Sequence, residues 1–312
     1  MKVVVMGAGQ MGSIYGAAAH ENGHDVWFVD AVPAIVDAIN ERGLLIDRRD
    51  GRQDAVKVPA TTDPASIGLT ADVLLFQTKG WATAAAAEAA RPIVGPDTIL
   101  LTLQNGLGNE EVLREAYPGN QVLIGMSVHT VITVDTAHYS HTGVRDTSLG
   151  PSSGEGTAAA ETAATAFRRD DFPVEVLPEL EIRTAQWSKF VLNCGSLPVA
   201  ALTRLRTDVL RDQALPFAVI DDLTRETCKI AKAAGIELDP EERVAFQHEL
   251  FATAGGRASM LGDVLAHRRT EIDTINGAAI RYAERYGVPS PLNRAVFNLV
   301  KGLEQAIALG EA

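Results

Sequence analysis

The sequence is short of cysteine and of positive charge, and each shortage excludes a class of protein. Its 312 residues include two cysteines, Cys194 and Cys228, too few for a disulfide framework. The 28 basic residues are outnumbered by 40 acidic ones, for a net charge of −12, which argues against nucleic acid as a partner because phosphate binding needs a basic surface. No apolar run reaches membrane length, and the first predicted strand begins at Lys2. We therefore expect a cytoplasmic protein with neither membrane span nor signal peptide.

Histidine is also scarce and shows no metal-ligand spacing. The seven histidines form no cluster with the cysteines, so we predict no metal site. No Ser-His-Asp arrangement is evident either. His129 follows a predicted strand, where a structural hydrogen bond is a more economical interpretation than a catalytic role.

A glycine-rich turn near the start of the chain is the strongest motif. The apolar stretch from Lys2 to Met6 predicts a buried strand, and a helical pattern follows the turn. The turn has the form G-x-G-x-x-G and consists of Gly7, Ala8, Gly9, Gln10, Met11 and Gly12. The first glycine permits the tight turn, the second lets the backbone approach a pyrophosphate, and the third lets helix pack on strand. The context predicts a dinucleotide site at the helix N-terminus, and a glycine turn without a ligand is the alternative.

A second predicted strand, from His24 to Val29, ends at Asp30. An acidic side chain about 20 residues beyond the glycines is positioned to bind the ribose diol of a dinucleotide. The residue that follows, Ala31, offers no cation to a 2′-phosphate. We therefore predict that NADH is preferred and that NADPH is the weaker cofactor.

Strand and helix patterns alternate through the first half of the chain, which predicts a parallel sheet with crossover helices. Lys79 follows the strand that ends at Gln77, and Asn105 follows the strand that ends at Leu103. Because ligands bind at the carboxyl ends of parallel strands, both side chains are candidates for the cofactor site. An ordinary loop residue is the alternative for each.

The predicted secondary structure changes near residue 180, where the alternation of strands and helices ends. Beyond it nearly every segment has a helical pattern, with breaks at prolines that include Pro198. We therefore predict an α/β fold with a Rossmann-type N-terminal domain, residues 1–180, and an all-helical C-terminal domain, residues 181–312.

The helical half contains a polar pair in apolar surroundings. Lys189 and Asn193 are four residues apart, so they share one helix face. Glu271 is predicted to lie on an apolar helical stripe with Ile275 and Ala278. A buried lysine has an easily lowered pKa and suits an inward carboxylate. The alternatives are a snorkelling lysine and an ion pair of Glu271 with a neighbouring arginine.

These residues together resemble the ketopantoate reductase (2-dehydropantoate 2-reductase) family over nearly the whole chain. The segments that carry the resemblance are GAGQMG at 7–12, TKGW at 78–81, QNGLG at 104–108, WSKFVLNC at 187–194, SMLGD at 259–263 and RTEIDTINGA at 269–278. The resemblance implies hydride transfer from a reduced nicotinamide to a 2-oxo acid, in a cleft between the two domains. It also implies that Lys189 is the general acid and Glu271 its support. Lys79 and Asn105 are then expected beside the nicotinamide, and Asn193 and Ser259 in contact with the substrate.

The sequence departs from the family pattern at two substrate positions, where Leu197 and Gly256 replace asparagines. The reaction class is thus better supported than the substrate. Ketopantoate is the family default, and a branched or aromatic 2-oxo acid, reduced by an NAD-dependent D-2-hydroxyacid dehydrogenase, is the alternative. A dinucleotide-binding sensor is the non-enzyme alternative, and a homodimer is an open question.

Overall fold

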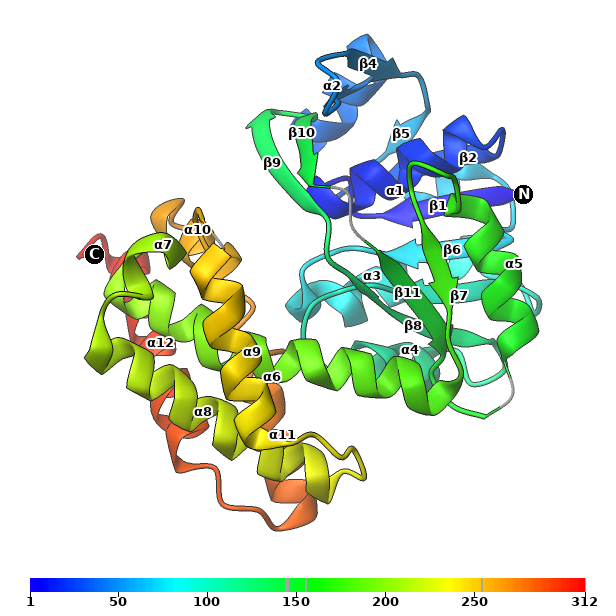
Figure 1. Cartoon of the computed structure of the whole chain (residues 1–312). Coiled ribbons are helices and arrows are strands. Elements are labelled where there is room, and N and C mark those ends of the chain that lie inside the picture. Colours follow the sequence, from blue (N-terminus) through cyan, green and yellow to red (C-terminus); the bar gives the residue numbers. More distant parts are fainter. Residues whose placement is uncertain (144–145, 155, 254, 312) are drawn as a thin grey trace. The chain divides into compact units, whose positions relative to one another are not determined.

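The chain divides into two compact units. In the computed structural model, which describes residues 1–143, 146–154, 156–253 and 255–311, unit 1 consists of Met1–Gln104 and Asn109–Arg183. Unit 2 consists of Asn105–Gly108 and Thr184–Ala312. Figure 1 shows the strands concentrated in the first part of the chain and the helices in the second.

Unit 1 is built on an eight-stranded sheet with the order β12-β11-β8-β7-β6-β1-β2-β5. The six strands from β5 to β8 run parallel, in the order of a dinucleotide-binding sheet. Strand β11 is antiparallel to β8, and β12 is parallel to β11. The strands are β1 (Lys2–Met6), β2 (Asp25–Val29), β5 (Ala60–Thr61), β6 (Val73–Phe76), β7 (Ile99–Thr102), β8 (Val122–Ser127), β11 (Thr147–Pro151) and β12 (Val174–Val176).

Helices cover both faces of this sheet because alternate residues of each buried strand point to opposite sides. Val3 and Val5 pack in one apolar cluster with residues of α1 and α5, and Val4 and Met6 pack in another with residues of α3 and α4. The helices of unit 1 are α1 (Gln10–Glu21), α2 (Pro33–Arg42), α3 (Thr83–Ala89), α4 (Asn109–Ala116) and α5 (Thr157–Phe167), with short 3₁₀ turns at Pro64–Ile67, Gly80–Ala82 and Arg91–Ile93. Both faces of the parallel strands are thereby buried.

A second, four-stranded sheet has the order β4-β3-β10-β9. The segment around Asp50-Gly51 joins β3 to β4 in an antiparallel hairpin, and β10 is antiparallel to β9. Its strands are β3 (Leu44–Asp47), β4 (Gln53–Val56), β9 (Thr130–Asp135) and β10 (His138–Gly143).

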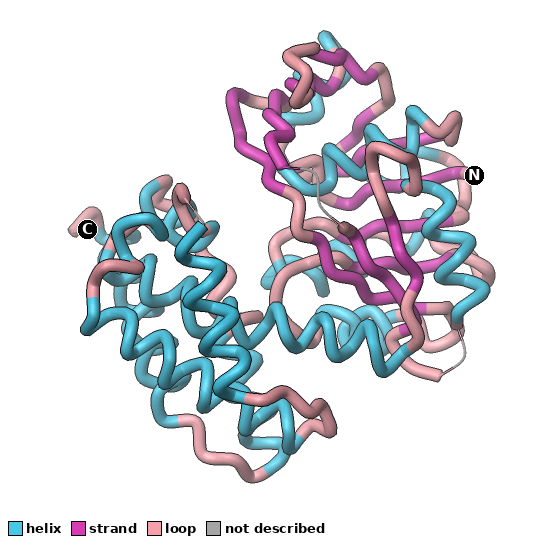
Figure 2. The backbone as a smooth tube through the Cα atoms, in the orientation of Figure 1, coloured by secondary structure: helices cyan, strands magenta, loops and turns pink. Residues whose placement is uncertain are grey.

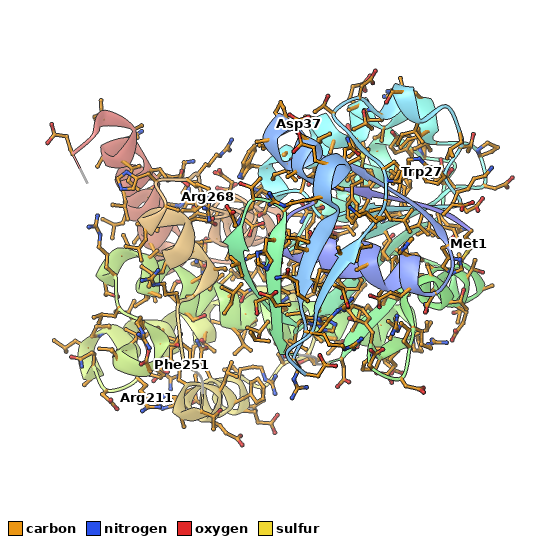
Figure 3. All side chains as sticks on the ribbon, turned by 90° about the horizontal axis from the view of Figure 1, so that it is seen from above. Met1, Trp27, Asp37, Arg211, Phe251 and Arg268 are labelled. Carbon is orange, nitrogen blue, oxygen red and sulfur yellow. The ribbon has the colours of Figure 1, made fainter. Side chains whose placement is uncertain are left out.

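Unit 2 is helical, as Figure 2 shows by colour. Its helices are α6 (Glu179–Thr203), whose first turn lies in unit 1, α7 (Thr207–Leu210), α8 (Ala214–Ala233), α9 (Pro240–Thr253), α10 (Ser259–Leu265), α11 (Asn276–Tyr286) and α12 (Pro291–Leu309). Its core includes Phe251, labelled in Figure 3, which packs edge-to-face on Phe217 with ring centroids 5.2 Å apart.

The break predicted at Pro198 is wrong. Pro198 lies inside α6, which continues to Thr203. Proline removes one intrahelical hydrogen bond and disfavours helix before it. Here Val199 and Ala200, directly after the proline, are buried, so tertiary packing outweighs that local preference. The predicted fold class is confirmed, namely a Rossmann-type α/β domain with an all-helical partner.

Candidate functional site

The glycine turn has the geometry that its three glycines were predicted to allow. At Gly7 the backbone has φ of +105°, and a Cβ there would lie 2.8 Å from the Gln77 carbonyl oxygen. A Cβ on Gly12 would lie 1.9 Å from the Gly7 carbonyl oxygen. Gly9, the N-cap of α1, has open space where its Cβ would be. Gly7 and Gly12 thus allow close packing, and Gly9 leaves room in which a ligand could approach the backbone.

Asp30 holds this turn from the end of β2. Its Oδ2 accepts a hydrogen bond from the Ala8 N–H at 2.8 Å, and its Oδ1 accepts one from the Val32 N–H at 2.9 Å. The carboxylate is partly exposed, and each oxygen has a second lone pair for a ribose hydroxyl. The residue predicted to bind ribose therefore also fixes the glycine turn.

Tyr139 and Ser13 were missed by the sequence reasoning. The Tyr139 hydroxyl, from β10, donates to the Ala8 carbonyl at 2.8 Å, and the Ser13 hydroxyl donates to the same oxygen at 3.0 Å. Burial, followed by the nearby charge of Asp30, raises the pKa of Tyr139 to about 12. No sequence signal marks the Tyr139–Ala8 contact, which joins residues 131 positions apart.

The residues present fit a dinucleotide. The first-turn N–H groups of α1 have no intrahelical acceptor and offer donors and a positive dipole end to a pyrophosphate. In addition, Nε2 of Gln77 is buried without a hydrogen-bond partner among the described residues. The backbone of Gln77 follows β6 and lies next to the turn at Gly7. A buried donor of this kind is costly unless a ligand accepts from it.

Lys79 and Asn105 follow neighbouring strands, as predicted. Lys79 is the N-cap of the turn Gly80–Ala82, and both side chains are partly buried. Gln104 connects the two strand ends, since its Nε2 donates to the Thr78 carbonyl at 2.7 Å and to the Thr83 hydroxyl at 2.9 Å. Lys79 belongs to unit 1, whereas Asn105 belongs to unit 2.

The loop 105–108 belongs to unit 2 because of its packing. The Leu107 N–H donates to the Thr274 carbonyl at 3.1 Å, and Leu107 is 1% exposed in the main apolar cluster of unit 2. At Gly106, φ is +86° and a Cβ would lie 2.1 Å from the Thr274 oxygen. Only glycine allows this approach.

Lys189 and Asn193 lie one turn apart on α6 and are both partly buried. Burial lowers the pKa of Lys189 to about 8, and the charge of Glu271 opposes this shift. The neighbouring Ser188 accepts a hydrogen bond from Nη1 of Arg243 at 2.7 Å. The lysine thus has a pKa near the physiological range and is influenced by the charge of the Glu271 carboxylate.

The predicted helical position of Glu271 is wrong. It precedes α11 and lies in the turn that runs from residue 271 to residue 275. The predicted burial is nevertheless correct, because Glu271 is 8% exposed. Of the residues that suggested a helical stripe, Ile275 enters the core of unit 2 from this turn and Ala278 enters it from α11.

The arginines next to Glu271 have carboxylate partners. Arg268, labelled in Figure 3, pairs with Asp263 at 3.0 Å. Arg269 pairs with Asp273 at 2.9 Å. Glu271 also acts on Lys189, since its charge raises the pKa of that lysine.

The remaining substrate candidates lie around α10. Ser259 is its first residue and is exposed. Leu197, two turns beyond Lys189 on α6, is 8% exposed and shares an apolar cluster with Met260. Gly256 has φ of +107° and open space around its Cβ position, so its backbone disfavours the asparagine of the family pattern.

His129, in contrast, has structural partners. Its Nδ1 is 3.1 Å from Nε2 of His141, and its Nε2 is 3.1 Å from the Thr147 hydroxyl. The ring stacks on Phe172 with centroids 4.5 Å apart. The structural role expected for His129 agrees with these contacts. Among the described residues, no group of three or more His, Cys, Asp and Glu side chains could hold a metal ion.

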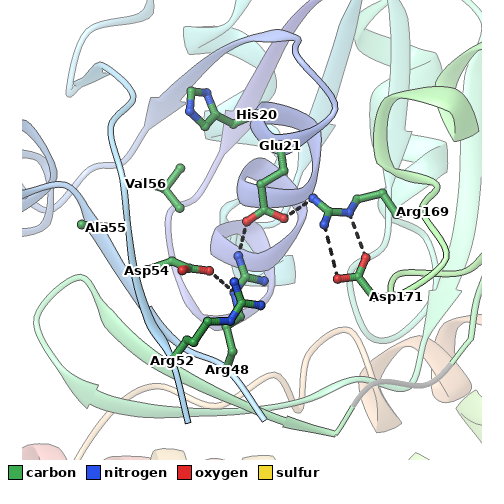
Figure 4. Close-up of a pocket in the computed structure, with 9 residues that line it drawn as sticks. All are labelled: His20, Glu21, Arg48, Arg52, Asp54, Ala55, Val56, Arg169 and Asp171. Carbon is green, nitrogen blue, oxygen red and sulfur yellow. Dashed lines mark hydrogen bonds and ion pairs between the residues drawn. The ribbon is translucent and has the colours of Figure 1, made fainter. Parts of the chain in front are cut away.

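One pocket in unit 1, with a volume of about 480 Å³, contains none of the predicted residues. It lies at the C-terminal end of α1, opposite the glycine turn (Figure 4). Its centre is Glu21, which pairs with Arg48 and Arg169, and these arginines also pair with Asp54 and Asp171 respectively. The charges compensate one another, so the cluster connects α1 to two neighbouring segments.

Residues 3–154 match the family described as Ketopantoate reductase PanE/ApbA, and residues 181–304 match its C-terminal part. The chain belongs to the ketopantoate reductase family. The 2-dehydropantoate 2-reductase of Vibrio cholerae is 30% identical and covers 98% of this chain and 99% of its own length. The Archaeoglobus fulgidus 2-dehydropantoate 2-reductase is 31% identical, with 98% and 99% covered.

Two solved structures extend this relationship. The PanE/ApbA family ketopantoate reductase from Ralstonia eutropha JMP134 has a TM-score of 0.86 at 30% identity, over 99% of this chain and all (100%) of that one. D-mandelate dehydrogenase in its ternary structure with NADH and anilino(oxo)acetate has a TM-score of 0.91 at 25% identity, over 99% and 100%. As a ketopantoate reductase-like protein, the chain is an NAD(P)H-dependent oxidoreductase of the class that acts on CH–OH groups. Its substrate is a small molecule. No helix in the described part of the chain is both long and apolar enough for a membrane span.

Proposed function

We propose that this ketopantoate reductase family member uses NADH to reduce a 2-oxo acid, with Lys189 as general acid. The observation that carries the proposal is the Lys189–Glu271 pair, a partly buried ammonium whose pKa is about 8 beside a buried carboxylate. A general acid works best when its pKa is near the working pH. A surface lysine without a catalytic role would keep a pKa near its usual value.

The protein side of the reaction follows from these groups. The reduced nicotinamide supplies a hydride to the substrate carbonyl carbon. Lys189 stabilises the negative charge that develops on the carbonyl oxygen and then donates its proton to that oxygen. Glu271 keeps the ammonium charged and oriented. Asn193 and Ser259 contact the substrate, and Lys79 and Asn105 lie beside the nicotinamide when it is bound.

The glycine turn, from Gly7 to Gly12 with Gln10 and Met11, binds the pyrophosphate of the cofactor, and Asp30 binds the adenosine ribose. We propose NADH over NADPH because Asp30 accepts hydrogen bonds from a ribose diol and repels a 2′-phosphate, while the exposed Ala31 offers no cation. The D-mandelate dehydrogenase structure, which contains NADH, supports this preference.

For the substrate, we propose a branched or aromatic 2-oxo acid in preference to ketopantoate, the family default. On the helix face that carries Lys189 and Asn193, the next position is Leu197. A leucine leaves a buried substrate hydroxyl without a partner, at a cost of about 1–3 kcal/mol. The bound anilino(oxo)acetate of D-mandelate dehydrogenase is an aromatic oxo acid and supports this choice.

Absorbance at 340 nm tests the proposal with ketopantoate, 2-oxoisovalerate, 2-oxoisocaproate and phenylglyoxylate, each with NADH and with NADPH. We expect the highest kcat/KM for an apolar oxo acid with NADH. A kcat/KM for ketopantoate that is about tenfold above the others would refute the substrate preference, since that ratio is worth about 1.4 kcal/mol. No turnover with any 2-oxo acid would refute the proposed reaction.

Leu197→Asn tests the specificity argument directly. This change should raise the kcat/KM of ketopantoate relative to 2-oxoisocaproate. Leu202→Asn is the matched control, because Leu202 lies further along α6 and packs against the same apolar cluster. If the ratio of kcat/KM for ketopantoate to kcat/KM for 2-oxoisocaproate were the same in the two variants, Leu197 would be excluded as a specificity residue.

A further inference from the structure

The proline inside α6 removes the helical donor of one backbone carbonyl. In an α-helix the carbonyl of residue 194 accepts from the N–H of residue 198, but Pro198 has no N–H. The Cys194 carbonyl accepts instead from Nδ2 of Asn276, at 3.0 Å. Cys194 and Asn276 are both 0% exposed. Asn276 thus supplies, where solvent does not reach, the hydrogen bond that the proline removes.

On the α11 side, this hydrogen bond anchors the end of the turn that carries Glu271. Asn276 is the first residue of α11 and directly follows the turn. The turn is itself closed by hydrogen bonds, because the N–H groups of Thr274 and Ile275 both donate to the Glu271 carbonyl at 3.1 Å. Anchoring Asn276 therefore fixes the backbone from which the Glu271 side chain extends.

On the α6 side, the anchored carbonyl lies beside the polar face of the helix. Cys194 directly follows Asn193, and Lys189 lies one turn before Asn193 on the same helix. The two partners of the hydrogen bond, Cys194 and Asn276, are 82 positions apart in the chain, and both belong to unit 2. Their contact therefore holds together two segments that no local structure connects.

A buried chain of hydrogen bonds that begins at Glu226 of α8 fixes the direction of the Asn276 amide. As an ionised carboxylate, Glu226 only accepts, and its Oε1 takes the Asn293 N–H at 2.8 Å and Nδ2 of Asn293 at 2.9 Å. The Oδ1 of Asn293 therefore faces Asn276 and accepts from its Nδ2 at 2.9 Å. The two hydrogens on Nδ2 of Asn276 thus serve Asn293 and Cys194 together.

We propose that Asn276 is a positioning residue, which uses the carbonyl left by Pro198 to hold Glu271 in a fixed place relative to Lys189. The inference rests on the proposed function, in which Lys189 is the general acid and Glu271 its support. A hydrogen-bond network that only stabilises unit 2 is the alternative. Loss of such a network would change stability alone, whereas loss of a positioning residue also changes the electrostatic environment of Lys189.

Titration of Lys189 by NMR tests this difference without any need for catalysis. The chain has seven lysines, so labelling with ¹³C at the lysine Cε gives few signals, and the signal missing from Lys189→Ala identifies Lys189. In Asn276→Leu its titration should move about one pH unit lower, because Glu271, whose charge raises the pKa of Lys189, is no longer held in place. The kcat with NADH and 2-oxoisocaproate should fall about 10- to 100-fold.

Gln247→Leu is the matched control. Gln247 is 1% exposed, and its Oε1 accepts from the Thr224 hydroxyl at 2.8 Å, so the change removes a buried hydrogen bond that joins α9 to α8. It should lower the thermal unfolding midpoint without moving the Lys189 titration or kcat. A shift of the Lys189 titration equal to that in Asn276→Leu would assign the shift to general loosening of unit 2 and overturn the proposal.

The double variant Asn276→Leu/Pro198→Ala separates positioning from stability. Alanine returns an N–H to position 198, so the Cys194 carbonyl regains its helical donor while the link to α11 stays broken. The unfolding midpoint should rise relative to Asn276→Leu, whereas the Lys189 titration and kcat should stay changed. This variant also provides the titration if Asn276→Leu does not fold.

A Lys189 titration at the wild-type pH in Asn276→Leu, or its return to that pH in the double variant, would overturn the proposal. Normal turnover in Lys189→Ala would refute the proposed function instead. The NMR titration would then still show whether Asn276 holds Glu271 relative to Lys189.

Discussion

The Ala8 N–H donates to Oδ2 of Asp30 across 2.8 Å. One carboxylate thus fixes the glycine turn, and it is also the group that we propose binds the adenosine ribose. Removing Asp30 would change both functions at once, so cofactor choice is better tested at the neighbouring, exposed Ala31.

We expect wild-type protein to prefer NADH over NADPH by roughly 30- to 1000-fold in kcat/KM, which corresponds to about 2–4 kcal/mol of lost contact and repulsion. Ala31→Arg should narrow this ratio by improving NADPH, because it adds a cation while the Asp30–Ala8 hydrogen bond remains. Titration of NADH and NADPH binding by fluorescence checks the same ratio without turnover. Equal or better catalysis by wild-type protein with NADPH would contradict the prediction.

The proposed catalytic role of Lys189 predicts that its removal lowers turnover strongly without weakening cofactor binding. Lys189→Ala should lower kcat by about 10²–10⁴ while NADH binding stays nearly normal, because the proposed partner of the lysine is the substrate oxygen. Steady-state kinetics and NADH titration of the same preparation separate the two effects. Near-normal turnover would show that Lys189 is a snorkelling residue.

The pH dependence gives an independent test of the same group. Because burial lowers the pKa of Lys189 to about 8, the fraction that holds a proton falls as the pH rises through 8. The kcat/KM for reduction should therefore decline above that pH. Glu271 raises the pKa of this lysine, so Glu271→Gln should move the decline to lower pH. A loss of activity without any shift of the profile would assign Glu271 a purely structural role.

The buried histidines predict instability in acid. Burial, then the charge of His141, lowers the pKa of His129 from 6.5 to about 4. In this interval the unfolded chain binds a proton that the folded chain does not, so stability is lost as the pH falls from 6.5 toward 4. With allowance for the partial exposure of the ring, the loss is on the order of 2 kcal/mol. Urea unfolding of wild-type protein and of His129→Gln at both ends of this pH interval tests the prediction. An equal loss of unfolding free energy in the two proteins would disprove it.

Substitution of Gly106 should destabilise the protein by a steric clash as well as by backbone strain. Gly235, which has nearly the same φ but open space around it, shows the cost of the strain alone. Gly106→Ala places a Cβ 2.1 Å from the Thr274 oxygen at a φ of +86°, and it should destabilise by about 2–4 kcal/mol. Gly235→Ala has nearly the same φ, +84°, in open space, and should cost about 1 kcal/mol. Comparable losses of unfolding free energy in the two variants would mean that the loop moves away from Thr274.

The features that the sequence predicts well are those determined by neighbouring residues. The glycine turn, the strand before it and the helix after it are local, and so is the four-residue spacing of Lys189 and Asn193. Pro198 and Glu271 were predicted incorrectly because tertiary packing decides their backbone conformation. At Glu271 the apolar spacing typical of a helix combines Ile275, which lies in a turn, with Ala278, which lies in α11.

Contacts between distant segments have no local signal. Tyr139 reaches the Ala8 carbonyl from 131 positions away, and nothing around Tyr139 indicates a role at the phosphate turn. The buried amide of Gln77 is another example. An apolar strand that ends in glutamine is unremarkable until the structure shows that its Nε2 has no partner among the described residues.

The membership of Asn105–Gly108 in unit 2 limits how this protein can be divided. The chain passes between the units after residues 104, 108 and 183, so no single cut yields two complete pieces. A fragment that starts at residue 184 lacks Leu107, which is 1% exposed in its core, and retains the cavity that this side chain fills. A transplant of the helical half onto another dinucleotide-binding domain must therefore also insert residues 105–108 of this chain into the recipient domain, or redesign the surface that receives them.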